Sequence, residues 1–338
     1  MTITDYLHKV MAGTDLSVAE MSKVMDEIMA GTATPAQVGA FLVALRLKGE
    51  HIGEVTGAAM AMRRHAAFID AGPGPVIDTC GTGGDGADTF NISTTAAFIA
   101  AGAGVTVAKH GNRGVSSRCG SADVLAELGF NLDVAPAVME HSIQTNGIGF
   151  LFAQKMHPAM KNVAPIRREL GVRTIFNMLG PLTNPAGASG QLLGVFSPDL
   201  TEMFAGTLRE LGCRRAMVVH GLDGLDEITC TTSTRISELR DGIIKTYELF
   251  PEMVIGTSYD AAAIKGGDIA VNARILRDIL AGKETGAPRA IAVLNAAAAI
   301  VVGEKADSLP EGLKLAEQAL DSGAAYQKLQ LLIEASQS

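Results

Sequence analysis

The chain has 338 residues, of which 47% are apolar and 19% are charged, and its formal net charge is -8. This length suits about two domains, and so apolar a composition excludes an intrinsically disordered chain. The acidic balance, without any run of Lys and Arg, argues against a nucleic-acid-binding protein.

The first 70 residues predict a set of short amphipathic helices. Capping-box patterns begin at Ser17 and Thr34, and Pro35 stands at the first helical position after the second one. Apolar side chains then recur at helical spacing over residues 38–45. We therefore expect residues 1–70 to form a small, all-helical domain.

Beyond the Pro73-Gly74-Pro75 linker, short strands alternate with helices. Strands are predicted near residues 76–79, 105–108, 147–152, 192–196, 216–220, 235–239 and 243–247. Helices are predicted near residues 93–101 and 122–128, and three more from residue 268 onward. This alternation predicts a large α/β domain over residues 75–338, with a mostly parallel central sheet covered by helices on both faces.

Neither the N-terminal sequence nor the longest apolar stretch indicates a membrane or secreted protein. The N-terminal sequence MTITDYLHKV has no apolar signal region, and the longest apolar stretch, residues 290–303, is too short to span a bilayer. The four cysteines form no CxxC pair, which favours reduced thiols over disulfides or structural zinc. We expect a cytoplasmic location.

A glycine-rich turn follows the first predicted strand. The sequence Gly81-Thr-Gly-Gly-Asp-Gly86 precedes Asn91-Ile-Ser-Thr94, which opens a helix. Glycines let backbone N–H groups close on a phosphate, and the N-terminus of the helix adds partial positive charge. The spacing matches neither the dinucleotide-binding nor the Walker pattern. A phosphate site is favoured over a merely structural turn.

A cationic loop follows the second strand, and an acidic loop follows a later one. Residues 109–117, Lys-His-Gly-Asn-Arg-Gly-Val-Ser-Ser, suit a polyanion at the carboxyl end of the sheet, although a solvated basic turn is the alternative. In Asp223-Gly-Leu-Asp226-Glu227, adjacent carboxylates suit a hard cation such as Mg²⁺, although a lone Asp-Glu pair is usually a solvated turn.

Three weaker motifs complete the set. They are Gln154–Met160, the pair Arg167-Arg168, whose guanidinium groups could hold a carboxylate, and Asn177–Pro185. Together the motifs predict a pyrophosphate-bearing substrate, Mg²⁺ and a small, partly aromatic acid. They leave open whether pyrophosphate leaves or phosphate enters in the reaction.

These motifs resemble those of the anthranilate phosphoribosyltransferases over nearly the whole chain. The resemblance rests on GTGGD at residues 81–85, NIST at 91–94, KHGNR at 109–113, HPAM at 157–160, RTIFN and LGPLTNP within 173–185, and GLDE at 224–227. It implies a fold of the nucleoside phosphorylase/phosphoribosyltransferase type. It also implies that the helical domain is joined by a segment around residues 165–185, and that a homodimer forms through the helical domains.

The resemblance further implies transfer of 5-phosphoribose from phosphoribosyl pyrophosphate to the amine of anthranilate in L-tryptophan biosynthesis. The residues implied for phosphoribosyl pyrophosphate are Gly81, Gly84, Asp85, Thr89, Asn91, Ile92, Ser93, Thr94, Lys109, His110, Gly111, Asn112, Arg113, Gly114, Val115, Ser116, Ser117 and Ser121. Those implied for anthranilate are Gly81, His110, Asn112, His157, Arg167 and Pro181, and those for Mg²⁺, with two ions per subunit, are Ser93, Asp226 and Glu227. No residue is assigned as a general base, because the aryl amine is already neutral at pH 7.

Two alternatives remain. A pyrimidine-nucleoside phosphorylase shares this fold and a Lys-bearing loop, but it has no need of an Asp-Glu metal pair. A non-catalytic, nucleic-acid-binding relative needs a basic surface, which a net charge of -8 does not favour.

Overall fold

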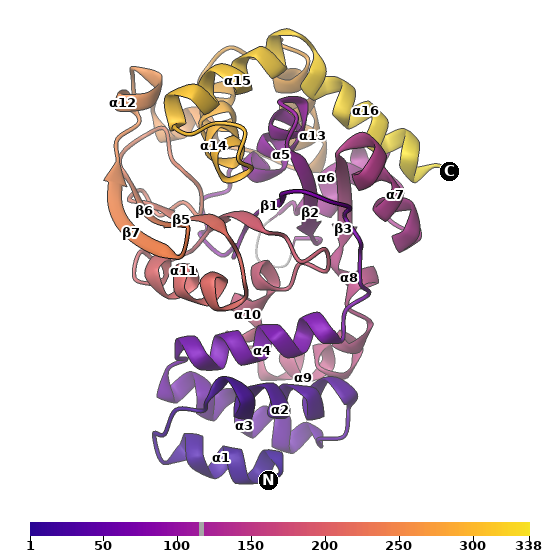
Figure 1. The fold of residues 1–338 in the computed structure, drawn as a ribbon, viewed down its shortest axis with the longest axis vertical. Helices are drawn as coiled ribbons and strands as arrows, with labels where there is room; N and C mark the ends of the chain where they lie inside the picture. Colours follow the sequence, from indigo (N-terminus) through magenta and orange to yellow (C-terminus); the bar gives the residue numbers. More distant parts are fainter. Residues whose placement is uncertain (115–117) are drawn as a thin grey trace.

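The computed structural model describes residues 1–114 and 118–338, and its N-terminal part is a bundle of helices at the lower end of Figure 1. These helices are α1 (Ile3–Met11), α2 (Val18–Ala30), α3 (Pro35–Lys48) and α4 (Ile52–Arg64). The predicted capping boxes are confirmed, since the hydroxyls of Ser17 and Thr34 accept bonds from backbone N–H groups at the third helical positions of α2 and α3.

The described residues of the upper part form a seven-stranded sheet in the order β3-β2-β1-β4-β5-β6-β7 (Figure 1). The strands are β1 (Val76–Gly81), β2 (Thr106–Gly111), β3 (Ile148–Phe152), β4 (Gly190–Gly194), β5 (Arg215–Gly221), β6 (Thr234–Arg240) and β7 (Ile243–Leu249). β1 to β5 pair in parallel, whereas β6 and β7 add to one edge antiparallel. The predicted α/β class with a mostly parallel sheet is therefore confirmed.

The order of the strands decides where a ligand can bind. The chain runs outward from β1 through β2 to β3, then returns to the other side of β1 as β4 and continues outward. In such a sheet, the loops leaving the strands on either side of the reversal point diverge and open a crevice at the carboxyl edge. The loops after β1, β2 and β5 carry the motifs picked out in the sequence.

Helices cover the sheet and form most of the core. They are α5 (Ile92–Gly102), α6 (Ser121–Glu127), α7 (Pro136–Asn146), α11 (Leu200–Glu210), α12 (Glu252–Ile255), η3 (Ala261–Ile264), α13 (Ile269–Leu280), α14 (Ala287–Val302), α15 (Leu309–Asp321) and α16 (Ala324–Ser336). The apolar stretch 290–303 is the buried helix α14, which packs on α5 and α15. The prediction of three helices after residue 268 was wrong, because Ser322 and Gly323, the latter at φ 76°, separate α15 from α16.

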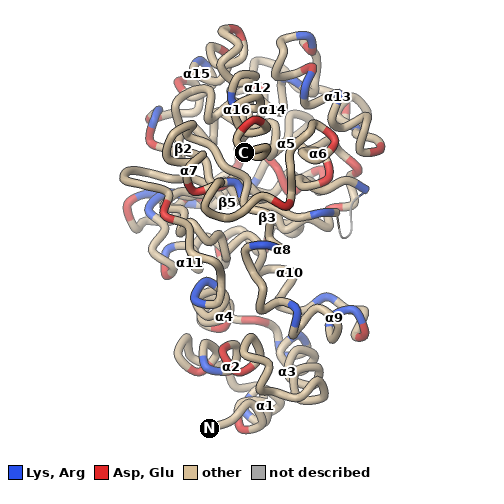
Figure 2. Tube along the Cα trace, turned by 90° about the vertical axis from the view of Figure 1, so that its right-hand side faces the viewer, with Lys and Arg blue, Asp and Glu red and all other residues tan. Residues whose placement is uncertain are grey.

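A central segment of the chain returns to the N-terminal bundle. It comprises α8 (Ala153–Met156), η1 (Pro158–Asn162), α9 (Ala164–Leu170), α10 (Phe176–Leu179) and η2 (Gly180–Leu182). α9 packs against α3, and Figure 2 shows α8 and α10 between the bundle and the part that holds the sheet. The Asn162 side chain donates a hydrogen bond to the Met29 carbonyl at 2.8 Å. Ile175 and Leu182 belong to the same buried cluster as Phe41 of α3.

Across the described ranges, no helix combines the length and apolar character needed to cross a membrane.

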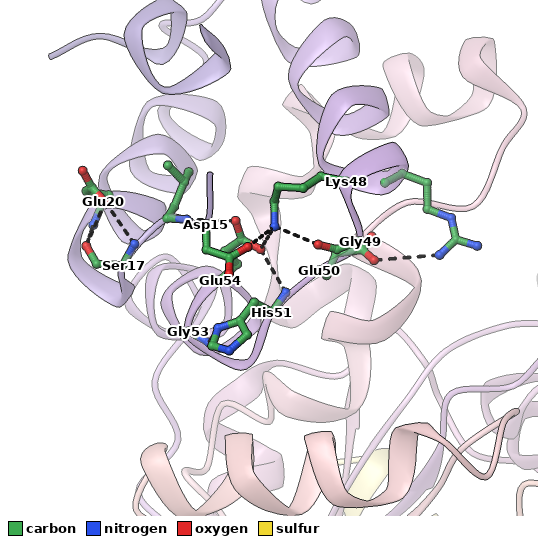
Figure 3. Close-up of polar contacts among 11 residues, drawn as sticks. Asp15, Ser17, Glu20, Lys48, Gly49, Glu50, His51, Gly53 and Glu54 are labelled. Atoms are coloured by element: carbon green, nitrogen blue, oxygen red, sulfur yellow. Dashed lines mark hydrogen bonds and ion pairs between the residues drawn. The ribbon is translucent and has the colours of Figure 1, made fainter. Parts of the chain in front are cut away.

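A buried carboxylate ties three parts of the bundle together (Figure 3). Glu54, in the first turn of α4, is fully buried and accepts a bond from Lys48 Nζ at 3.0 Å and one from the His51 N–H at 2.9 Å. Its other oxygen accepts the Leu16 N–H at 3.0 Å, ahead of α2. Lys48, whose side chain is 7% exposed, also pairs with Asp15. The end of α3, the start of α4 and the α1–α2 loop thus meet at one ion pair.

We predict that Lys48→Met lowers the free energy of unfolding by about 3 kcal/mol, because it leaves the Glu54 charge buried without its cation. Lys9→Met is the matched control, since the Lys9–Glu20 pair has side-chain exposures of 37% and 25% and should be worth less than about 1 kcal/mol. Urea denaturation of both variants measures the two losses. Equal losses would contradict the central role of Glu54.

Candidate active site

A polar cavity of about 320 Å³ lies beyond the carboxyl ends of β1 and β2. Its wall contains all the described residues that the resemblance implies for phosphoribosyl pyrophosphate: Gly81, Gly84, Asp85, Thr89, Asn91, Ile92, Ser93, Thr94, Lys109, His110, Gly111, Asn112, Arg113, Gly114 and Ser121. Val115, Ser116 and Ser117 lie outside the described residues. Loops that are distant in sequence therefore converge on one cavity.

The glycine-rich turn between β1 and α5 has a backbone that ordinary side chains disfavour. Gly83, Gly84 and Gly86 all lie in the left-handed region, with φ of 66°, 81° and 68°. Only glycine enters this region without strain, so the repeated glycines are required by the path of the loop. The loop leads into the N-terminus of α5, an 11-residue helix whose first residues line the cavity. Exposed N–H groups and the helix dipole make this a favourable place for a phosphate.

Two acidic residues after β5 hold this loop and this helix. Asp226 Oδ2 accepts the Gly83 N–H at 2.7 Å, and Glu227 Oε1 accepts the Ser93 N–H at 3.0 Å. The pKa of Asp226 is raised to about 7, mainly by burial and secondly by the charge of Asp85. Burial and the charge of Asp226 likewise raise the pKa of Glu227 well above its usual value.

Such raised pKa values mark carboxylates that have too little positive charge around them. A divalent cation would supply that charge, and carboxylate and hydroxyl oxygens are the ligands that Mg²⁺ prefers. Asp226, Glu227 and Ser93, the predicted metal ligands, line the same cavity. The chemistry of this donor set therefore fits Mg²⁺.

A buried polar network holds the start of the KHGNR loop, residues 109–113. Lys109 is only 4% exposed, and its Nζ donates to the Thr79 carbonyl. Burial raises the pKa of Asp78 to about 6, and the charge of Lys109 opposes this rise. Asp78 accepts the His110 N–H at 3.1 Å and the Asn184 side chain at 2.8 Å. This network therefore sets the position of both Lys109 and His110.

A second cavity of about 720 Å³ lies between the sheet and the helical segment 153–183. All the residues implied for anthranilate line it: Gly81, His110, Asn112, His157, Arg167 and Pro181. Gly81, His110 and Asn112 also line the first cavity, so the two cavities share a wall. Two substrates bound in these cavities would meet at that wall.

Two histidines stand side by side at this boundary. Nε2 of His110 lies 3.2 Å from Nε2 of His157, and the rings cross edge-to-face with centroids 5.0 Å apart. Burial lowers the pKa of His110 to about 3 and that of His157 to about 4. Both rings are therefore neutral at pH 7, with one N–H donating to the lone pair of the other. So weakly basic a pair is a poor general base at that pH.

Arg167 on α9 supplies a cation to the second cavity. Its guanidinium lies 5.4 Å from the centre of the Phe176 ring and is half-buried. Burial lowers the pKa of this guanidinium below its usual range. In the part of the chain that the structure describes, no carboxylate forms an ion pair with it. An unpaired guanidinium in an otherwise partly apolar cavity suits the carboxylate of a small acid.

Several wall residues were missed by the sequence analysis. Arg173 lies 4.8 Å from the centre of the Phe196 ring and donates to the Gly84 carbonyl at 3.2 Å. Gly266 and Asn272 reach the first cavity from the segment before α13 and from its first turn. Arg173 lay within the RTIFN motif, and the Gly266-Gly267 pair was a visible signal, but neither was treated as part of the site.

Two family models match separate parts of the chain. Residues 4–66 match the family model described as glycosyl transferase family, helical bundle domain. Residues 73–326 match the model described as glycosyl transferase family, a/b domain.

Individual relatives are similar over almost their full length. The chain is 56% identical over 331 residues to anthranilate phosphoribosyltransferase of Syntrophobacter fumaroxidans, covering 98% of both chains. The crystal structure of anthranilate phosphoribosyltransferase from Thermus thermophilus is 44% identical with a TM-score of 0.93, covering 98% of this chain and 99% of that one. The Saccharomyces cerevisiae enzyme in complex with PRPP and Mg is 28% identical with a TM-score of 0.90, over 99% and 98% of the chains.

Proposed function

Because the chain belongs to the anthranilate phosphoribosyltransferase family, we infer that it transfers the 5-phosphoribosyl group of phosphoribosyl pyrophosphate to the amine of anthranilate. The products are N-(5-phosphoribosyl)anthranilate and pyrophosphate, in L-tryptophan biosynthesis. The observation that carries this conclusion is the shared wall of Gly81, His110 and Asn112, which joins a phosphate-type cavity to a cavity holding an unpaired arginine.

We propose that the 320 Å³ cavity holds phosphoribosyl pyrophosphate through the residues predicted for it. The N-terminus of α5 and those N–H groups of the 81–86 loop that Asp226 does not bind would stabilise the leaving pyrophosphate, whose charge grows as the bond to ribose C1 breaks. Lys109 adds positive charge from the floor of the cavity. Ser93, Asp226 and Glu227 would hold Mg²⁺, which would add further positive charge beside the pyrophosphate. The yeast relative has been solved with PRPP and Mg, which supports this assignment.

The acceptor is proposed to lie in the 720 Å³ cavity, with its carboxylate on Arg167. A related yeast structure, 28% identical, contains 4-fluoroanthranilate. The amine nitrogen attacks C1 as the C1–oxygen bond breaks and pyrophosphate leaves. The nitrogen then carries a positive charge, which it loses by releasing a proton to water. Since the aryl amine starts out neutral, the neutral pair His110 and His157 can line the path without acting as a base. The main contribution of the site is to hold the two substrates in line.

The reaction itself is the first test. Anthranilate fluorescence should fall only when the protein, phosphoribosyl pyrophosphate and Mg²⁺ are all present.

Asp226→Asn combined with Glu227→Gln should lower turnover by at least about a hundredfold at low Mg²⁺, because the leaving group loses its cation. Full activity of this double variant at low Mg²⁺ would contradict the metal assignment. If the wild type gave no fluorescence change, phosphorolysis of uridine or thymidine and then nucleic-acid binding would be measured.

Arg167→Ala should raise the KM for anthranilate by about tenfold or more and leave the KM for phosphoribosyl pyrophosphate within about twofold, because one charge-assisted bidentate contact is lost. Arg209→Ala is the matched control, since Arg209 is an exposed arginine on α11 that lines neither cavity. Steady-state kinetics with each substrate varied in turn measures both constants. An unchanged KM for anthranilate in Arg167→Ala would remove Arg167 from that site.

We propose a helical domain made of residues 1–70 and a segment around residues 165–185, and an α/β domain over residues 75–338. The packing of α9 on α3 and of α10 on α4 supports joining this segment to the bundle. We propose two Mg²⁺ ions per subunit, as predicted from the sequence. We also propose a cytoplasmic location and no membrane or nucleic-acid partner.

We also propose that the helical domains join two copies into a homodimer. A groove of about 1150 Å³ runs along α1, α3 and α9, and most of its lining side chains are apolar. Leu47, which lines it, is 82% exposed. Such a groove is the kind of surface that a second subunit covers in a stable dimer.

Leu47→Glu should therefore weaken the dimer, because dimerisation would bury a new charge. Sedimentation velocity at several concentrations measures the dissociation. Ile243→Glu is the control, since Ile243 is 61% exposed on β7 and away from the groove. A wild type that sediments as a monomer, or equal effects of both substitutions, would refute the proposed interface.

A further inference from the structure

We propose that Lys265 and Gly266 form a clamp that positions the 85–90 loop for phosphoribosyl pyrophosphate. This inference rests on the proposed function, because it concerns the same cavity. Both are positioning residues, since they act through the loop. The loop carries Asp85 and Thr89, two of the residues predicted to contact the substrate.

The loop needs support from outside. Gly86 adopts φ 68°, and Asp88 adopts φ 52°, which is uncommon for any residue with a side chain. Within the loop, the side chain of Asp85 accepts the Ala87 N–H at a rather long 3.3 Å. A backbone in sparsely populated conformations persists only when its surroundings fix it.

The segment after η3 provides that support at consecutive residues. Lys265 Nζ donates to the Ala87 carbonyl at 2.6 Å, and the Gly266 N–H donates to the Asp88 carbonyl at 2.8 Å. Lys265 also forms an antiparallel bridge with Thr89. Asp88, whose backbone is left-handed, is therefore held at its own carbonyl, and its neighbours Ala87 and Thr89 are held as well.

The fit between the clamp and the loop is tight. A Cβ added to Gly266 would stand 2.7 Å from the Phe90 nitrogen and 2.8 Å from the Thr89 carbonyl carbon, both of which are backbone atoms. Real Cβ atoms do not approach backbone so closely, so the loop would have to move. The clamp has a firm base, because Asn272 in the first turn of α13 is 2% exposed and accepts the Gly267 N–H at 2.8 Å.

The clamp touches only one of the two cavities, as far as the described residues go. Gly266, Gly267 and Asn272 line the phosphate-type cavity together with residues of the 85–90 loop. Among those same described residues, the second cavity is lined by Gly81–Gly84 but not by the 85–90 loop or the clamp. A weakened clamp should therefore affect phosphoribosyl pyrophosphate and leave anthranilate unaffected.

Lys265→Met and Gly266→Ala test this selectivity. Each should raise the KM for phosphoribosyl pyrophosphate about five- to tenfold and leave the KM for anthranilate within about twofold. Lys265→Met loses a hydrogen bond from a charged donor, whereas the Cβ of Gly266→Ala displaces the loop backbone. Lys265→Arg keeps the cation and should restore most of the wild-type constant. Lys305→Met, at an exposed lysine between α14 and α15, is the matched control and should change neither constant.

Isothermal titration with phosphoribosyl pyrophosphate and Mg²⁺ makes the same comparison without catalysis. A wild type that binds this ligand but does not consume anthranilate would refute the proposed function, and the ratio of dissociation constants would still decide the clamp. An unchanged affinity for phosphoribosyl pyrophosphate in both Lys265→Met and Gly266→Ala would overturn the proposed clamp. So would equal losses for both substrates together with a lowered melting temperature, since they would indicate general destabilisation.

Discussion

The site depends on the contact between a pair of buried carboxylates and two backbone N–H groups. Asp226 binds the glycine-rich loop through Gly83, and Glu227 binds the start of α5 through Ser93. One acidic loop after β5 thus fixes the glycine-rich loop and the start of α5 relative to each other. The carboxylates that are proposed to hold Mg²⁺ also organise the loops that are proposed to bind phosphoribosyl pyrophosphate, so the geometry of both parts of the proposed site is set together.

This contact is possible only because the backbones approach closely. A Cβ on Gly194 would lie 1.5 Å from the Asp226 carbonyl oxygen, and a Cβ on Gly81 would lie 2.3 Å from its Oδ2. The last residues of β4 and β1 must therefore both be glycine if the acidic loop is to lie across the ends of these strands. Part of the glycine content of the chain is explained by this packing requirement, and part by the left-handed turn at residues 83–86.

Much of this architecture was predictable from the sequence. Gly81–Asp85 and Lys109–Arg113 follow recognisable strands, and the ends of parallel strands meet at one edge of a sheet. Asp78 was not recognised, because a single carboxylate inside an apolar strand gives no sign of its partner Asn184, which is remote in the sequence. Arg173 and Lys265 were missed for the same physical reason. Their roles consist of bonds to backbone carbonyls, which any residue provides and which therefore leave no pattern in the sequence.

The shared wall between the two cavities limits how the two substrate affinities can be changed. Gly81 lines both cavities and lies against Asp226, so a side chain added there would disturb both proposed substrate sites and the proposed metal ligand at once. His110 and Asn112 line both cavities in the same way. Variants with an altered acceptor range should therefore arise at positions that line only the second cavity, such as Met62, Met160 and Phe176, where selection can act on one substrate alone.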